Sequence, residues 1–400
     1  MLYFGNKAKE VSGLINAITF NIEKVLNDKE LSKLLSIGLL KGKGGLALYY
    51  YYYSKLSNNH VYNNKASEIL VEINNNFEKT GENFTFHSGI AGLGWLIEHL
   101  KRNDFIYADT NNILSEVDKY LNKIMISYYD SDYFDFLYGS LGLSLYFLKR
   151  NCSDEITNNI LNQLIALKLW EKTKYKWLGS NQKIREIDLG LAHGVSGIIC
   201  VLCKLYNKQK NKKRVTECIT ENVNFLISIA NNISKSIFSF PNFLSINNSK
   251  IETISTLGWT HGDLPVGISI YLAGKTTGNK LWQNKAIEII LHTCKRKDYT
   301  EEIKGIYNIS LCIGTAGIAH IYHRMYLYTG IEMFKESAIY WFDKTMALYI
   351  KQSDKIKLFT EKDKLQERVE LLYGQAGVGL ALISTISNIE PCWDECFLLS

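Results

Sequence analysis

The chain has 400 residues, of which 46% are hydrophobic and 22% are charged, and its formal net charge is +6. This composition is ordinary for a globular protein with a large core, and the sequence lacks the basic stripe and binding motif that a nucleic-acid partner requires. Only three prolines occur. Because proline interrupts a helix by removing a backbone donor, their scarcity favours long helices.

The N-terminal residues do not have the pattern of a secretory signal, because charged residues follow Met1–Gly5 where an apolar run would stand. No apolar run reaches the roughly 18 residues that a membrane-spanning helix needs. The nearest, Leu34–Tyr53, contains Lys41 and Lys43. The sequence therefore predicts a cytoplasmic protein without a membrane span, whose scattered cysteines are thiols and not disulfides.

A unit of the form Gly-x-x-Gly, followed by an apolar run, recurs along the chain at intervals of about 50 residues, which is typical of a repeat protein with two helices per repeat. The leading glycines of the units are Gly42, Gly89, Gly139, Gly194, Gly262, Gly314 and Gly374. We expect each glycine to form a tight turn at the start of a helix.

In chain order, the first expected helix carries the tyrosine run Tyr49–Tyr53, which we interpret as ordinary packing. The second and fourth, at Leu93–Leu96 and Ile198–Leu202, are hydrophobic nearly all round and are therefore expected to be buried. The segments between the units, such as Ile156–Trp170, are amphipathic and suit an outer layer. The sequence thus predicts one all-α domain over residues 1–400, with seven buried helices whose turns converge on one cavity.

The longest interval between leading glycines separates Gly194 from Gly262. It contains Ser234–Ile246, where polar and apolar residues partly alternate, and we expect a short hairpin or an irregular flap there. The fifth unit is also imperfect, because Pro265 stands where its second glycine is expected.

Four segments are more specific than the repeat itself, namely Gly190–Gly197, Gly258–Leu264, Leu311–His320 and the tail Glu390–Ser400. With these flanks and seven units in order, the whole chain resembles the lanthionine synthetase C-like (LanC) family. The resemblance implies an α/α toroid of seven inner and seven outer helices. It also implies thioether ring formation, in which a cysteine of a precursor peptide adds to dehydroalanine or dehydrobutyrine, with a dehydratase as a further partner.

The same resemblance implies the residues that handle the proton in this reaction. His193 matches the histidine of the family's Ala-His-Gly motif, and Asp135 matches the aspartate that supports it. Trp259 matches the tryptophan that precedes the first zinc ligand. We therefore expect His193 and Asp135 to be the catalytic pair.

The family also implies a zinc ion that binds the substrate thiol and lowers its pKa, held by two cysteines and a histidine. Cys312 matches the second cysteine, but Thr260 and Ile313 occupy the positions of the other two ligands. His261 stands in place of a tyrosine, and Thr256 in place of an arginine. Isoleucine cannot bind a metal and a neutral hydroxyl is a poor zinc ligand, so we expect zinc to bind weakly or not at all.

Three interpretations stay open. The zinc is lost, and the protein is a non-catalytic pseudo-cyclase that binds a peptide or acts as a scaffold. Alternatively, a rebuilt metal site uses His261 and Cys312, with His193 or His87. In the third interpretation, cyclase chemistry continues without metal, or another residue activates the thiol. In each case we expect Asp135, His193, His261 and Cys312 to lie around one cavity.

Other residues with chemical potential have simpler interpretations. The Cys200–Cys203 motif lies within an apolar helix and predicts core packing. His320 and His323 lie far along their helix and are expected in the core or at its edge. Asp263 is expected to interact with a helix N-terminus. The turns carry too few carboxylates for the acidic site of a toroid glycosidase.

Overall fold

The computed structural model describes residues 1–76, 83–128, 135–150, 152–166, 186–231, 236–245, 255–297, 309–355 and 368–400. In this part of the chain nearly all regular structure is helical, and the predicted all-α class is confirmed. Contacts divide the chain into two compact units, one made of Met1–Ala108 with Thr300–Trp393 and the other of Asp109–Tyr299 with Asp394–Ser400. None of the described helices combines the length and apolarity needed to cross a membrane.

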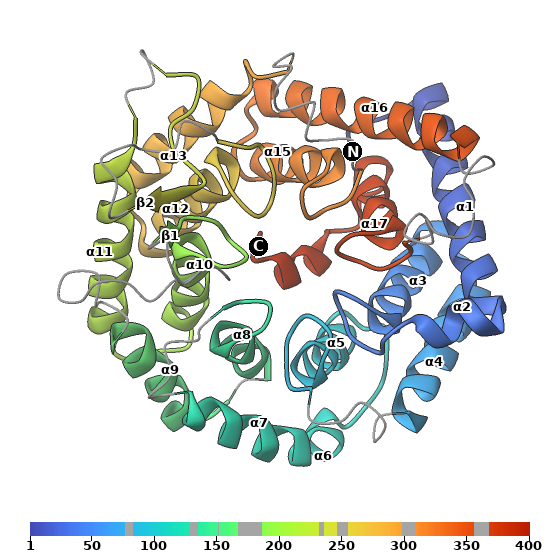
Figure 1. Cartoon of the computed structure of the whole chain (residues 1–400), viewed down its shortest axis with the longest axis horizontal. Helices are drawn as coiled ribbons and strands as arrows, with labels where there is room; N and C mark the ends of the chain where they lie inside the picture. The colour runs from blue at the N-terminus through green and yellow to red at the C-terminus, as the bar shows by residue number, and fades with distance from the viewer. Residues whose placement is uncertain are drawn as a thin grey trace. The chain divides into compact units, whose positions relative to one another are not determined.

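The first unit has a buried helical layer and a covering layer. The buried helices are α3 (Lys43–Ser57), α5 (Ile90–Arg102), α15 (Thr315–Thr329) and α17 (Gln375–Ile386), and the covering helices are α1 (Gly5–Asn27), α2 (Lys29–Leu34), α4 (His60–Asn75) and α16 (Glu332–Lys355). Helix α3 packs on α4, and α15 packs on α16 (Figure 1). Helix α4 buries only Ala66, Ile69 and Ile73, which is the single apolar stripe of a surface helix.

The second unit repeats this arrangement. Its buried helices are α8 (Ser140–Arg150), α10 (Val195–Tyr206) and α12 (Asp263–Thr277), covered by α6 (Thr110–Ile113), α7 (Ser115–Ser127), α9 (Asp154–Ala166), α11 (Lys213–Ile229) and α13 (Lys280–Thr293). Helix α10 packs on α11, and α12 packs on α13 (Figure 1). A short 3-10 helix, η5 (Cys392–Phe397), precedes the C-terminus.

Every buried helix begins at the residue after a leading glycine, as the repeat pattern predicted. At Gly262 the backbone has φ of 93°, and a Cβ atom there would lie 1.8 Å from the carbonyl oxygen of Thr256. Only glycine tolerates this turn without strain. Pro265 occupies the first turn of α12, where the missing N–H removes no intrahelical hydrogen bond.

The tyrosine run Tyr49–Tyr53 is packed in the interior of the first unit, as predicted, with side chains that are at most 7% exposed. The rings of Tyr49 and Tyr53 stack with their centroids 5.9 Å apart. The Tyr49 hydroxyl shares a 2.7 Å hydrogen bond with the hydroxyl of Thr19 on α1. The run therefore joins α3 to the covering helix.

Backbone hydrogen bonds join neighbouring helix-entry turns of the first unit. The N–H of Leu40 donates to the carbonyl oxygen of His87 over 2.9 Å, and the N–H of Leu372 donates to the carbonyl oxygen of Leu40 over 2.9 Å. The N–H of Cys312 in turn donates to Leu372 over 3.2 Å. The turns that precede α5, α3, α17 and α15 are thus linked in series.

The second unit has the same kind of link. The N–H of Phe136 donates to the carbonyl oxygen of Ala192 over 3.2 Å, and the N–H of Leu191 donates to the carbonyl oxygen of Thr260 over 3.1 Å. These bonds gather the turns before α8, α10 and α12. The convergence of all seven turns on one cavity stays a prediction.

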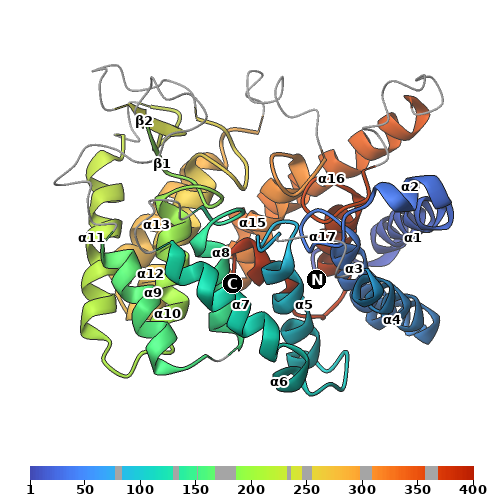
Figure 2. The ribbon, with the colours of Figure 1, turned by 60° about the horizontal axis from the view of Figure 1, so that its bottom comes forward.

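Two short strands complete the described secondary structure. Strand β1 (Glu186–Asp188) pairs antiparallel with β2 (Phe243–Ser245), with Asp188 opposite Phe243, and both views show them side by side (Figures 1 and 2). A strand is thus present in the expected segment Ser234–Ile246, but its partner is β1 and not a neighbouring strand of a hairpin. Residues 234, 235 and 246 of that segment lie outside the described residues.

Candidate active site

A hydrogen-bonded pair formed by His193 and Asp135 lies at the entry turns of α10 and α8. The Nδ1 atom of His193 donates to Oδ2 of Asp135. The other carboxylate oxygen, Oδ1, accepts the backbone N–H groups of Leu137 and Tyr138 over 2.7 and 2.8 Å. These backbone donors fix the carboxylate, and the carboxylate in turn orients the imidazole, whose side chain is 35% exposed.

Opposing effects set the protonation of His193. Burial disfavours the imidazolium, but the hydrogen bond and negative charge of Asp135, together with the charge of Asp188, favour it. The pKa of His193 is consequently raised above its ordinary value of 6.5. Because Nδ1 is bound to Asp135, the Nε2 edge of the ring is the one that can exchange a proton with a ligand.

A second pair of the same kind lies beside the first. The Nε2 atom of His261 is 3.0 Å from Oδ2 of Asp188, and Oδ1 of Asp188 accepts the backbone N–H of Gly190 over 2.7 Å. The side chain of His261 is 21% exposed. The ring centroids of His193 and His261 are 6.5 Å apart, so the second unit presents two imidazole–carboxylate pairs together.

The strand pair and a glycine explain why these groups meet. Asp188 ends β1, and its partner in register, Phe243 on β2, places its ring 4.7 Å from the His261 ring. A Cβ atom at Gly190 would lie 1.6 Å from the carbonyl oxygen of Thr260. Glycine therefore allows the turn of His193 to approach the turn of His261 closely.

Sequence reasoning identified His193, Asp135 and His261, and the structure brings these three together. It missed Asp188. The sequence feature that could have pointed to Asp188 is its position two residues before Gly190, because an aspartate so placed before a glycine is common in turns. Its pairing with His261, however, depends on contacts between segments that are far apart in sequence.

Cys312 and Ile313, the other positions of the predicted site, lie in the first unit and not in the second. Cys312 lies in the first unit and is almost fully buried. Burial raises the pKa of its thiol to about 12, although a hydrogen bond with Tyr373 lowers it in part. The neighbouring Ile313 is 46% exposed. These surroundings favour the thiol form of Cys312 over the thiolate, and its place in a cavity with the two histidines stays a prediction.

These residues do not fit a catalytic zinc ion, which requires three protein ligands. Thr260 and Ile313 supply neither a thiolate nor an imidazole, so two of the three ligand positions of the family pattern lack a strong zinc ligand. Within the described ranges, no three His, Cys, Asp or Glu side chains form a group that could hold a metal ion.

Other candidates from the sequence are structural. Cys200 and Cys203 are buried on α10, and burial raises the pKa of both thiols, which fits core packing. The His320 ring packs 4.6 Å from Trp393 in the first unit. Asp263 is fully buried and pairs with Arg296 over 2.9 Å, so its main interaction is an ion pair.

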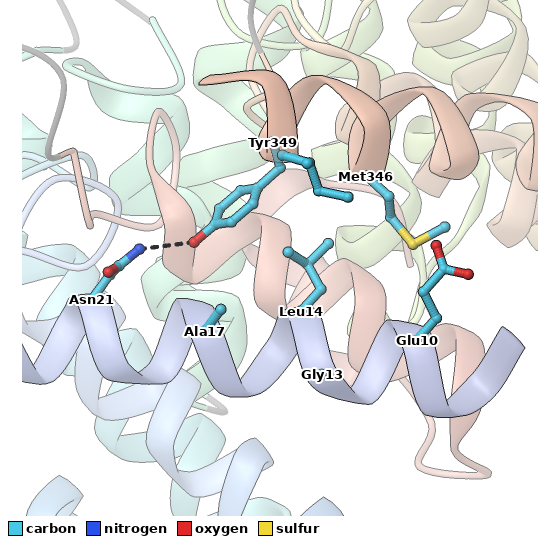
Figure 3. A pocket seen from close by; sticks show the side chains of 8 residues that line it. Glu10, Gly13, Leu14, Ala17, Asn21, Met346 and Tyr349 are labelled. Atoms are coloured by element: carbon cyan, nitrogen blue, oxygen red, sulfur yellow. Dashed lines mark hydrogen bonds between the residues drawn. The ribbon is translucent and has the colours of Figure 1, made fainter. Parts of the chain in front are cut away.

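The first unit also contains a groove between α1 and α16, with a cavity volume of about 380 Å³. Figure 3 shows the hydrogen bond from Asn21 to the hydroxyl of Tyr349, 2.8 Å long, at one end and Glu10 at the other. The wall between them consists of Gly13, Leu14, Ala17, Met346 and Ile350. None of the predicted site residues lines this groove.

A family model described as "Lanthionine synthetase C-like protein" matches residues 34–398. The chain belongs to this family. Among curated relatives, the LanC-like chain is similar to "Nisin biosynthesis protein NisC" of Lactococcus lactis subsp. lactis, with 21% identity over 334 residues, 75% of this chain and 78% of the relative. A solved structure named "Nisin cyclase" has a TM-score of 0.73 and 17% identity, and covers 97% of both chains.

The structural likeness confirms the predicted fold, the α/α toroid of the LanC family. The family match spans residues of both compact units. This LanC-like protein nevertheless differs from the family's zinc pattern at Thr260 and Ile313, and it pairs His261 with Asp188 beside His193. Its site is thus rich in acid–base groups and poor in metal ligands.

Proposed function

We propose that this LanC-like protein closes thioether rings in a dehydrated ribosomal precursor peptide by acid–base chemistry, without a catalytic zinc ion. The observation that carries the proposal is the His193–Asp135 pair, in which backbone N–H groups fix the carboxylate and the imidazole edge stays accessible. The proposal includes a single domain over residues 1–400 and a cytoplasmic location, where cysteines stay reduced. A dehydratase would supply the substrate.

The reaction adds a cysteine thiol across the double bond of dehydroalanine or dehydrobutyrine. A sulfur–carbon bond forms at the β-carbon, the π electrons move toward the carbonyl group, and the α-carbon takes up a proton. Protonated His193 can deliver this proton from Nε2, because Asp135 holds the ring by Nδ1 and stabilises the imidazolium. The thiol proton leaves to a base, so the overall addition neither gains nor loses atoms.

A second candidate function is that of a pseudo-cyclase, which binds the precursor peptide or holds a dehydratase without catalysis. The residues Thr260 and Ile313 favour it, because the family's metal ligands are missing at these positions. In this case His193 and Asp135 would contribute to binding or to stability alone.

The two functions are separated by a ring-closure assay on the metal-free protein. The probe is a synthetic peptide that contains one cysteine and one dehydroalanine. Closure leaves the mass unchanged but removes the free thiol, so alkylation followed by mass spectrometry measures it. We expect closure above the uncatalysed background, and a decrease of about 100-fold in His193→Ala, the usual contribution of a general acid.

Two results would overturn this proposal. If the peptide binds but its thiol is alkylated as fast as in buffer, the pseudo-cyclase is the better account. If closure appears only after zinc is added, the reaction depends on metal, and the zinc-free mechanism is wrong.

A further inference from the structure

The second imidazole–carboxylate pair, His261 with Asp188, has no counterpart in the residues that the family resemblance implied. It lies directly beside the His193–Asp135 pair, with 6.5 Å between the ring centroids. Both imidazoles keep part of their surface exposed, 35% for His193 and 21% for His261. Both carboxylates are also held by backbone N–H groups. The two pairs thus have the same construction and lie next to each other in the second unit.

We propose that His261, oriented by Asp188, takes the proton from the cysteine thiol of the peptide, while His193 gives a proton to the α-carbon. This inference deepens the proposed ring closure and rests on it. His261 is then a catalytic residue that contacts the substrate thiol, and Asp188 is a positioning residue that acts through His261.

The hydrogen bonds of the two rings leave one nitrogen of each available for a substrate. His193 binds its carboxylate through Nδ1, whereas His261 binds its carboxylate through Nε2. Because a carboxylate only accepts hydrogen bonds, the bound nitrogen carries the hydrogen in each neutral ring. The opposite nitrogens, Nε2 of His193 and Nδ1 of His261, are left to act on a substrate.

The distances also suit one addition reaction. A general acid or base works at about 3 Å from the atom that it serves. In the addition, the sulfur and the α-carbon are both bonded to the same β-carbon, so the two proton transfers take place close together. Two rings whose centroids are 6.5 Å apart can therefore serve both atoms at once.

The proton balance closes over one turnover. The thiol proton passes to Nδ1 of His261, the sulfur–carbon bond forms as the carbon–carbon π bond breaks, and the α-carbon accepts a proton from Nε2 of His193. His261 then releases its proton to water and His193 takes one up. No oxidant, reductant or metal ion is needed for these steps.

The strand pair β1–β2 holds the side chain of His261 in position. The ring of Phe243 on β2 lies 4.7 Å from the ring of His261. Asp188, the last residue of β1, is opposite Phe243 in the strand pair. A purely structural clamp would have the same contacts, so the test must separate proton transfer from folding.

The experiment compares His261→Gln, Asp188→Asn and His193→Gln with the wild-type protein, after unfolding curves show which variants are folded. His292→Gln is the matched control, because His292 is in the same unit and its Nε2 atom lies 2.9 Å from the backbone oxygen of Ser236. Ring closure is measured as above. Thiolate formation is measured by ultraviolet absorbance with a bound peptide in which alanine replaces dehydroalanine.

We expect His261→Gln to lower ring closure by about 100-fold and to abolish the thiolate signal. His193→Gln should lose closure but keep the thiolate signal, a separation that a structural clamp cannot produce. His292→Gln should keep both. If His261→Gln does not fold, the nearly isosteric Asp188→Asn variant tests the same pair.

Several results would overturn the inference. Closure and thiolate signal at wild-type levels in both His261→Gln and Asp188→Asn would leave the proposed function intact and remove His261 from it. A parallel loss in His292→Gln would reduce the effect to folding. Absence of closure in the wild-type protein would overturn the proposed function, and this inference with it.

Discussion

The backbone N–H of Leu191 donates a hydrogen bond to the carbonyl oxygen of Thr260, with 3.1 Å between the two atoms. This bond joins the entry turns of α10 and α12. His193 and His261 follow Leu191 and Thr260 closely in sequence. The spacing of the two histidines is therefore set by main-chain atoms, and it depends on the glycine that lets the turns approach each other.

Gly190→Ala is expected to destabilise the protein by about 3 kcal/mol, because the new methyl group would lie 1.6 Å from the Thr260 oxygen and the turns must separate. Gly13→Ala on α1 is the control, since nothing lies within 4 Å of its added carbon and alanine favours a helix. Urea unfolding measures both. Equal midpoints for the two variants would contradict the proposed close approach.

Arg296→Met is expected to cost about 3–5 kcal/mol, because it leaves the fully buried carboxylate of Asp263 without its counter-charge. Lys285→Met is the control, since it breaks a partly exposed pair with Glu288 and should cost less than about 1 kcal/mol. Thermal unfolding compares the two. A small effect of Arg296→Met would show that Asp263 is stabilised mainly by its backbone donors, Ser239 and Phe240.

Asp135→Asn is expected to lower the pKa of His193, because it removes the negative charge that outweighs burial. A raised histidine pKa stabilises the folded state fully below pH 6.5, and this contribution is lost as the pH rises through the raised value. The stability difference between wild type and variant should thus shrink at higher pH. Histidine NMR titration and unfolding at several pH values test this, and an unchanged titration of His193 would contradict it.

Glu395→Gln is expected to destabilise the C-terminal segment by roughly 2 kcal/mol at neutral pH. Burial opposes ionisation of Glu395, but the charges of Lys204 and Lys149 outweigh it and lower the pKa to about 2. The contribution is present above pH 4.5 and is lost as the pH falls toward 2. Unfolding at pH 7 and near pH 2 measures it. Glu332→Gln, an exposed surface change, should have little effect at either pH.

The double variant Thr260→Cys with Ile313→His is expected to bind zinc at near one-to-one amounts, because it restores the two missing ligands of the family pattern, in which Cys312 matches the third. Elemental analysis after dialysis is the measurement. Thr260→Ser with Ile313→Leu is the control, which changes the same positions without adding ligands. A double variant that stays free of metal would mean that these three positions do not form a zinc site in this protein.

The repeat pattern was sufficient to predict the buried helices, because each glycine turn and the apolar run after it are local in sequence. Helix α10, for example, begins at Val195, directly after Gly194. The His193–Asp135 pair could be predicted from motif positions alone. Asp188 could not be found in this way, since its partner His261 is brought to it by the pairing of two distant strands. The burial of Asp263 with Arg296 is equally non-local.

The link between Leu191 and Thr260 has a consequence for how such a site can change over evolutionary time. It uses only the peptide groups of these two residues, so the side chain at position 260 takes no part in this bond. A cysteine, a threonine or another small residue can therefore occupy that position while the scaffold keeps its geometry. The chemistry at these turns can diverge one residue at a time, and the same freedom makes them a suitable frame for engineered reactions.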